Sequence, residues 1–217
     1  MEKHILKAMD TFGEDIVRNA TTPATSYLFN VRDSELLSEE KADIFHSVTA
    51  SLLLTSWRCC LDIQTAVAFL TTRVSCPTQD YWIKLRRVLQ YLRGTIDMKL
   101  TLWADDITKV TTWVDVSYGV HNDCCSYMEG AISFGWGVLL AKCQKQKTYT
   151  KSSGVSDFLP NLIWALMFLQ AQSFILQNNI LYQDNQSAMK YESHGWVLSG
   201  QKTKHIDNRY FWIKDCL

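Results

Sequence analysis

The sequence lacks the features that mark several classes of protein. No run of about 18 apolar residues occurs, so a membrane-spanning helix is not expected. The 3 prolines and 9 glycines are too few for a collagen-like, repeat or low-complexity chain. The N-terminus shows no basic segment followed by an apolar one, so no secretory signal is expected and the predicted location is intracellular.

An excess of charge of one sign is absent as well. The 22 Lys and Arg residues balance 22 Asp and Glu residues, so no overall field concentrates nucleic acid or an anionic membrane at the chain. Any binding face must therefore be local, and no membrane partner is expected. The 47% of hydrophobic residues supply a sizeable core for one large domain or two small ones among the 217 residues.

The 7 cysteines show no Cys-x-x-Cys or Cys/His spacing suited to zinc. They include two adjacent pairs, at 59–60 and 124–125, and an odd number cannot all pair with one another. A disulfide framework conflicts with the missing signal sequence, which favours free and mostly packed thiols.

Apolar periodicity divides the first hundred residues into two parts. Residues 1–40 contain 4 basic and 8 acidic residues around Pro23 and are predicted to form an irregular acidic arm. Residues 41–97 contain three stripes of helical spacing, which predict a small helical unit. Gly94 is predicted to cap the third of these helices.

Residues 98–217 have a different pattern. Short β-rich runs over 98–103, 109–116, 131–141 and 144–150 precede a long apolar helix predicted over 158–176. A strand over 179–183 and two further helices, near 187–192 and from 207, are expected to follow. This order predicts an α/β fold with a mixed sheet.

Two carboxylates stand at predicted strand ends in matching contexts. Asp115 lies in Trp-Val-Asp-Val-Ser, and Asp184 lies in Tyr-Gln-Asp-Asn. Acids at the rim of a sheet can be brought together by neighbouring strands to hold Mg²⁺. The alternative is that each aspartate caps a turn or a helix, since Asp184 is followed by the polar residues that helix starts favour.

Several ordered blocks of sequence resemble copia-type LTR-retrotransposon polyproteins. The collinear match covers about residues 40–217 and joins the reverse transcriptase connection segment to the ribonuclease H region. The blocks are Phe45-His46-Ser47, residues 62–70 and 87–95, Trp113-Val114-Asp115, residues 135–138, 145–147 and 150–153, Tyr182-Gln183-Asp184-Asn185-Gln186-Ser187-Ala188, and residues 204–211.

This resemblance implies a ribonuclease H-like fold that cleaves RNA in RNA–DNA hybrids with two Mg²⁺ ions held by four carboxylates. Asp115 matches the family's first-strand acid and Asp184 its fourth-strand acid. Both are thus implied as catalytic and metal-binding residues. The expected fold is a truncated ribonuclease H-like mixed sheet with helices, preceded by a small helical unit.

The other two acids of the family pattern have no match. The family has a glutamate-containing stretch after the serines matched by Ser152 and Ser153, and here about six residues are missing at that point. Asp157 matches a later family residue and would lie roughly 9 Å away along a helix. Asp207 and Asp215 belong to the helix that precedes the family's fourth acid, which would lie beyond Leu217.

A polymerase is excluded by the absence of a palm with paired aspartates. The pair Asp105-Asp106 follows the helical unit and is interpreted as a solvated turn. Lys145 and Lys147 on one predicted strand, and Arg86 and Arg87 on the third helix, are candidate phosphate contacts. The alternative for these residues is an ordinary solvated face.

The sequence therefore predicts a remnant of a reverse transcriptase/ribonuclease H, inactive because two of its four metal-binding acids are missing. At most one weakly bound Mg²⁺ is expected, and an RNA–DNA hybrid or other nucleic acid is the expected partner. A missing last strand leaves a sheet edge that a protein partner could cover. A non-catalytic nucleic-acid-binding or protein-interaction module, and a decayed reading frame, remain alternatives.

Overall fold

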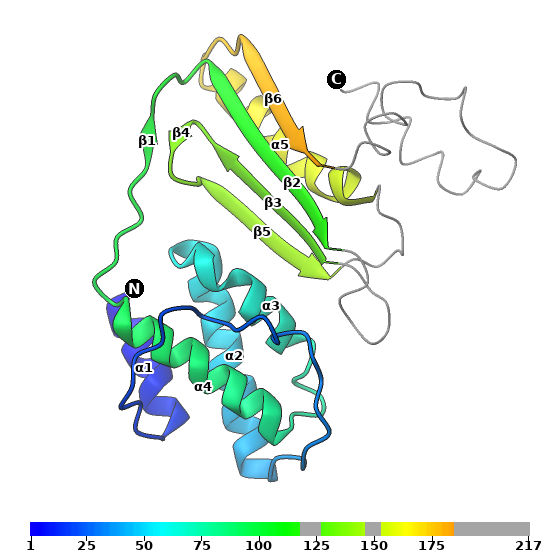
Figure 1. The fold of residues 1–217 in the computed structure, drawn as a ribbon. Helices are drawn as coiled ribbons and strands as arrows, with labels where there is room; N and C mark the ends of the chain where they lie inside the picture. Colours follow the sequence, from blue (N-terminus) through cyan, green and yellow to red (C-terminus); the bar gives the residue numbers. More distant parts are fainter. Residues whose placement is uncertain (118–126, 146–152, 185–217) are drawn as a thin grey trace, which may run out of the picture. The chain divides into compact units, whose positions relative to one another are not determined.

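The computed structural model describes residues 1–117, 127–145 and 153–184 (Figure 1). The chain divides into two compact units: Met1–Thr101 with Cys143–Lys145, and Leu102–Lys142 with Gln146–Leu217. Within the described residues, no helix is both long and apolar enough to cross a membrane.

The first unit is built from helices. They are α1 (Glu2–Phe12), α2 (Glu39–Arg58), the 3-10 turn η1 (Leu61–Ile63), α3 (Gln64–Thr71) and α4 (Gln79–Gly94). Helix α2 begins at Ser38, whose hydroxyl accepts a hydrogen bond from the Lys41 backbone N–H. Helix α4 runs through Gly94, so Thr95 is its C-cap and the predicted end is wrong by one residue.

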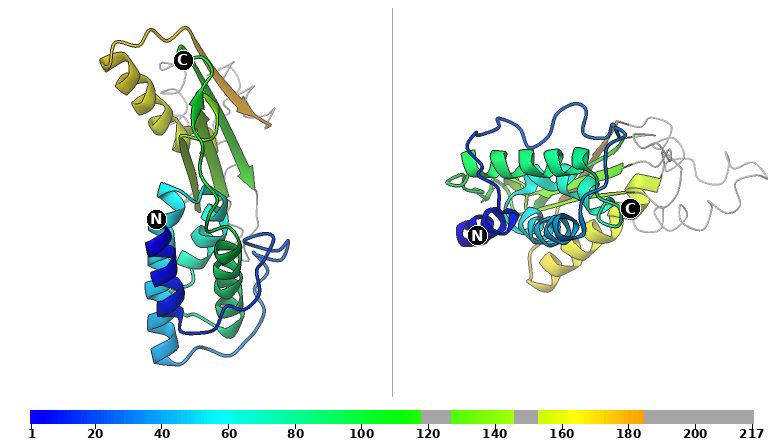
Figure 2. Two further views of the ribbon diagram at one scale, coloured as in Figure 1. Left: turned by 90° about the vertical axis from the view of Figure 1, so that its left-hand side faces the viewer. Right: turned by 90° about the horizontal axis from the view of Figure 1, so that it is seen from below.

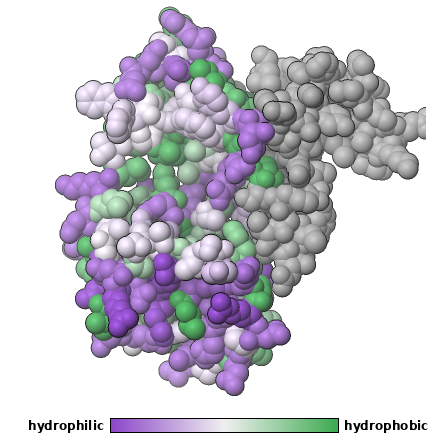
Figure 3. Space-filling view, viewed as in Figure 1, coloured by the Kyte–Doolittle hydropathy of each residue, from purple (hydrophilic) through white to green (hydrophobic). Residues whose placement is uncertain are grey.

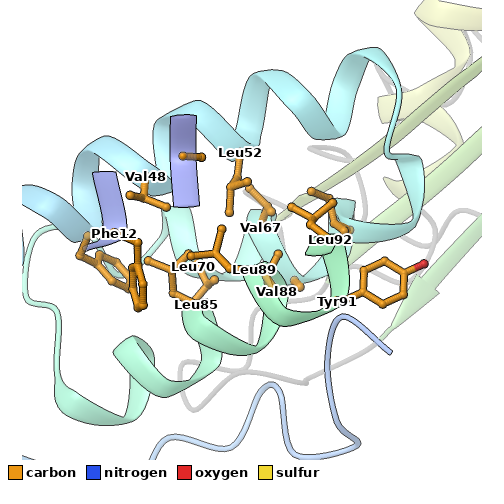
Figure 4. Packing of buried hydrophobic residues seen from close by; sticks show 14 of the residues in the cluster. Phe12, Val48, Leu52, Val67, Leu70, Leu85, Val88, Leu89, Tyr91 and Leu92 are labelled. Atoms are coloured by element: carbon orange, nitrogen blue, oxygen red, sulfur yellow. The ribbon is translucent and has the colours of Figure 1, made fainter. Parts of the chain in front are cut away.

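One apolar core joins these helices (Figure 4). Phe12 stacks on Trp82 with ring centroids 4.3 Å apart, and both side chains are fully buried. Leu52 from α2, Leu70 from α3 and Leu89 from α4 are inaccessible to solvent. On the face drawn in Figure 3, the surface of this unit is mostly hydrophilic, with hydrophobic residues in separate spots.

The prediction of an irregular arm over residues 1–40 is wrong for its first part. Residues 2–12 form α1 because Ile5, Ala8 and Phe12 recur at helical spacing and face the core. Gly13 ends the helix with φ 74°, a left-handed conformation that favours glycine. Farther on, the Leu37 backbone N–H donates to the carbonyl of Pro77, which joins the arm to the start of α4.

Cys59 and Cys60 lie at the end of α2 as free thiols. Burial and the neighbouring Cys59 thiol raise the pKa of Cys60 to about 12, so its reactive thiolate is scarce at neutral pH. Cys76 is also a free thiol in the described part of the chain.

The second unit holds a four-stranded mixed sheet of order β5-β3-β2-β6, except for the last three residues of β5, which are grouped with the first unit. Its strands are β2 (Lys109–Ser117), β3 (Tyr127–Ser133), β5 (Leu140–Lys145) and β6 (Asn178–Gln183). β2 pairs antiparallel with β3 and parallel with β6. β1 (Trp103–Ala104) and β4 (Gly135–Trp136) form a separate short antiparallel pair.

Helix α5 (Ser153–Ala171) lies along one face of this sheet (Figures 1 and 2). Alternate residues of β2, among them Val110 and Val114, are buried against α5 residues such as Phe158 and Leu162. The predicted α/β class with a mixed sheet is confirmed, and the architecture is compatible with a ribonuclease H-like fold.

Three boundaries differ from the sequence prediction. The first β-rich run is reduced to β1, and the run over 131–141 is divided among β3, β4 and β5. The apolar helix begins at Ser153 instead of residue 158 and ends at Ala171. The strand predicted over 144–150 and the helices near 187–192 and from 207 lie largely or wholly outside the described residues.

Gly130 is required by the contact between the sheet and α5. A Cβ added there would lie 2.2 Å from Cδ2 of the fully buried Phe158.

Gly130→Ala is therefore expected to lower the free energy of unfolding by about 1–3 kcal/mol through overpacking. Urea denaturation checks this value. Thr111→Ala, on the other face of β2, is the control, and equal midpoints for the two variants would contradict the contact.

Candidate functional site

The two predicted aspartates follow the last registered pair of two neighbouring strands. In the parallel pairing, Val114 of β2 is in register with Gln183 of β6; Asp115 is the next residue of β2, and Asp184 directly follows β6. The two strands run the same way, and β2 continues beyond this level to Ser117 (Figure 1). Both side chains are exposed, and Asp115 Oδ1 accepts a 2.6 Å hydrogen bond from the Val116 backbone N–H.

Strand alternation puts this pair on the face of the sheet that α5 does not cover. Val110 and Val114 of β2 point to α5, so Trp113 and Asp115 point to the opposite face. Both aspartate side chains are thus exposed on that face in the described part of the chain.

Glu129 is a third carboxylate in the same row, which sequence reasoning missed. It lies opposite Asp115 in the antiparallel pairing of β2 with β3, on the same face of the sheet. The register that brings Glu129 to Asp115 was the missing information.

The acids present do not fit a two-metal site. Among the residues that the structure describes, no group of three or more His, Cys, Asp or Glu side chains is arranged to hold a metal ion. The first turn of α5 contains no acid, and Asp157 is the helix's one carboxylate. Asp157 directly precedes Phe158, which packs into the core, and it completes no such group. Asp207 and Asp215 lie outside the described residues.

Asp105 and Asp106 form part of a turn before β2. Asp106 Oδ1 accepts hydrogen bonds from the Thr108 hydroxyl at 2.6 Å and the Thr108 backbone N–H at 2.9 Å. These two bonds hold the pKa of Asp106 below its usual value. The arrangement is that of a solvent-exposed Asx turn, as the sequence predicts.

The basic residues singled out on α4 have partners within the helical unit. Arg86 forms an ion pair with Glu14, which also accepts a 2.8 Å hydrogen bond from Trp82 Nε1. Arg87 donates to the Thr22 hydroxyl at 3.0 Å. Both guanidinium groups thus hold the segment after α1 against α4, and each would have to exchange its partner to contact a phosphate.

Lys145 is the candidate lysine that the structure describes, and it lies on the sheet edge opposite β6. Lys145 is the last residue of β5 and is half-buried. Lys147 lies outside the described residues. The structure thus describes one of the two lysines, on the strand at the opposite edge from β6.

The sequence is 27% identical over 227 residues to the retrovirus-related Pol polyprotein from transposon TNT 1-94 of tobacco (Nicotiana tabacum), a copia-type element. The similarity covers 99% of the chain. The chain is related to retrotransposon Pol polyproteins. This relationship confirms the family predicted from the sequence blocks, although it does not identify the segment of the polyprotein.

The chain spans 17% of the length of that tobacco polyprotein. No family model matches the sequence, and no solved structure matches it.

The pairing of Arg86 with Glu14 predicts a structural effect on substitution. Arg86→Gln is expected to lower the free energy of unfolding by about 0.5–1 kcal/mol, since the pair is partly exposed to solvent. Chemical denaturation measures the change, with the exposed Arg93→Gln as the control. An unchanged midpoint together with weakened nucleic-acid binding would contradict this assignment.

Proposed function

We propose that the chain corresponds to the connection segment and ribonuclease H region of a copia-type polyprotein, and that it binds RNA–DNA hybrids without cleaving them. The observation that carries this proposal is the parallel register of β2 and β6. It brings together Asp115 and Asp184, the two acids that the family resemblance assigns to the metal site.

The absence of cleavage follows from the shortage of anionic ligands. Two divalent cations close together need several carboxylates besides the scissile phosphate. The resemblance leaves the helix acid without a match, and the first turn of α5 has none. Glu129 lies opposite Asp115, but the described carboxylates form no group of three that could hold a metal ion. Asp115 and Asp184 therefore hold at most one Mg²⁺, weakly, and the site does not support two-metal hydrolysis.

Binding without cleavage needs contacts to the phosphate backbone. Lys145 and Lys147 are the proposed contacts, because four lysines recur among polar residues over 142–151. Each phosphate neutralised by a lysine releases counterions, so the affinity falls with salt concentration. This salt dependence distinguishes the proposed lysine–phosphate contacts from apolar docking.

A protein-interaction module is the second candidate function. Trp164, Met167 and Phe168 are 62%, 63% and 51% exposed on the outer side of α5, and no charged residue occurs over 158–176. An apolar helix face of this kind suits a protein partner. β6 is also an edge strand within the described sheet and offers a second surface for such a partner.

Gel analysis of a labelled blunt RNA–DNA hybrid with Mg²⁺ tests the proposal. The unaltered chain is expected to retain the hybrid and leave it intact. Lys145→Gln combined with Lys147→Gln is expected to weaken retention and to reduce the slope of log affinity against log salt by about two units or less. Lys3→Gln combined with Lys7→Gln, on exposed positions of α1, is the matched control.

Two results would contradict the proposal. Cleavage that disappears in Asp115→Asn would show that another acid completes an active site. Failure of a cooperatively unfolding sample to retain the hybrid would exclude hybrid binding and favour the protein-interaction function.

A further inference from the structure

An exposed aromatic pair lies beside the two aspartates. Trp113 of β2 and Tyr182 of β6 are in register, with ring centroids 6.0 Å apart and planes 18° from parallel. Their side chains are 43% and 50% exposed. Two large rings are therefore held together by the sheet and still offer surface to a ligand.

The same register fixes the surroundings of this pair. Asp115 and Asp184 follow the two rings by two residues, which is about 6.7 Å along a strand on the same face. Lys109 begins β2 on that face, four residues before Trp113, and its side chain is exposed. One face thus presents a cation, then two aromatic rings, then two carboxylates.

We propose that Trp113 and Tyr182 form a stacking platform for unpaired nucleobases of a nucleic-acid strand bound at the aspartates. This inference rests on the proposed function. Bases stack on exposed aromatic side chains of a sheet in several single-strand-binding proteins, and the contact tolerates any sequence because every base has a π-face. Bases within a duplex are already stacked on each other, so the platform serves single-stranded nucleotides.

The charges on this face suit a base better than an apolar protein surface. A carboxylate next to the rings can accept a hydrogen bond from the exocyclic amino group of a stacked base. Lys109, at the other end, can contact a phosphate of the same strand. An apolar partner would leave these charged groups buried without a matching charge, whereas the outer face of α5 has no such groups.

Helix α5 provides a matched control for the platform. Trp164 and Phe168 are also stacked, with centroids 5.5 Å apart and planes 15° from parallel. They are 62% and 51% exposed, but α5 packs on the other face of the sheet. Removing either pair deletes a similar exposed aromatic surface. A larger loss of nucleic-acid binding for the Trp113 and Tyr182 variants would therefore indicate a specific role of that pair.

Fluorescence anisotropy with a labelled single-stranded RNA 12-mer tests the platform. Trp113→Ala and Tyr182→Ala are each expected to weaken binding by about 5-fold to 100-fold, the range for loss of one stacked base. Trp113→Phe is expected to retain most of the affinity because a ring remains, and Trp164→Ala is expected to bind like the unaltered chain. Circular dichroism and thermal unfolding verify that each variant keeps its fold.

Comparing a blunt hybrid with one that carries a single-stranded overhang tests the platform independently of the proposed function. The chain is expected to bind a hybrid with a single-stranded overhang more tightly than a blunt hybrid, and Trp113→Ala is expected to remove the difference. If the overhang adds nothing, or if Trp113→Ala and Trp164→Ala have equal effects, the platform is wrong even where the blunt hybrid is bound. If the overhang strengthens binding while the blunt hybrid is cleaved or not bound, the platform is supported and the proposed function is wrong.

Discussion

The parallel pairing of β2 with β6 is the constraint on which the candidate site depends. β2 lies inside the described sheet, with β3 on one side and β6 on the other. Because side chains alternate along each strand, one register decides at the same time which residues face α5 and which face solvent. A shift of one residue in β6 would separate Asp184 from Asp115 and Tyr182 from Trp113. The aspartate pair and the aromatic pair therefore depend on the same hydrogen bonds.

The two faces of this sheet are specialised differently. The face that meets α5 is tightly packed, with Gly130 leaving space for the ring of Phe158. The opposite face exposes polar groups beside aromatic rings, as expected of a surface that binds a ligand. The first turn of α5 has no acid, and the helix still packs on the sheet. In the proposed function, the binding surface on the opposite face is therefore independent of the ligands needed for hydrolysis.

The sequence predicted the parts whose signals are local. The β-rich runs over 109–116 and 179–183 indicated β2 and β6. The predicted strand end is right for Asp184, which directly follows β6, and wrong for Asp115, since β2 continues to Ser117. Helix α1 was missed because the acidic residues and Pro23 outweighed its short apolar stripe. The position of Glu129 and the stacking of Trp113 on Tyr182 depend on pairing between distant segments, which periodicity along one strand does not specify.

Counting bound Mn²⁺ tests the proposed cause of inactivity, a shortage of metal ligands, most directly. Electron paramagnetic resonance during a Mn²⁺ titration of the full chain measures the number of ions bound without involving nucleic acid. At most one weakly bound ion per chain is expected, and it is lost when Asp115 and Asp184 are both replaced by asparagine. Two ions bound at sites that require both aspartates would contradict the proposed cause.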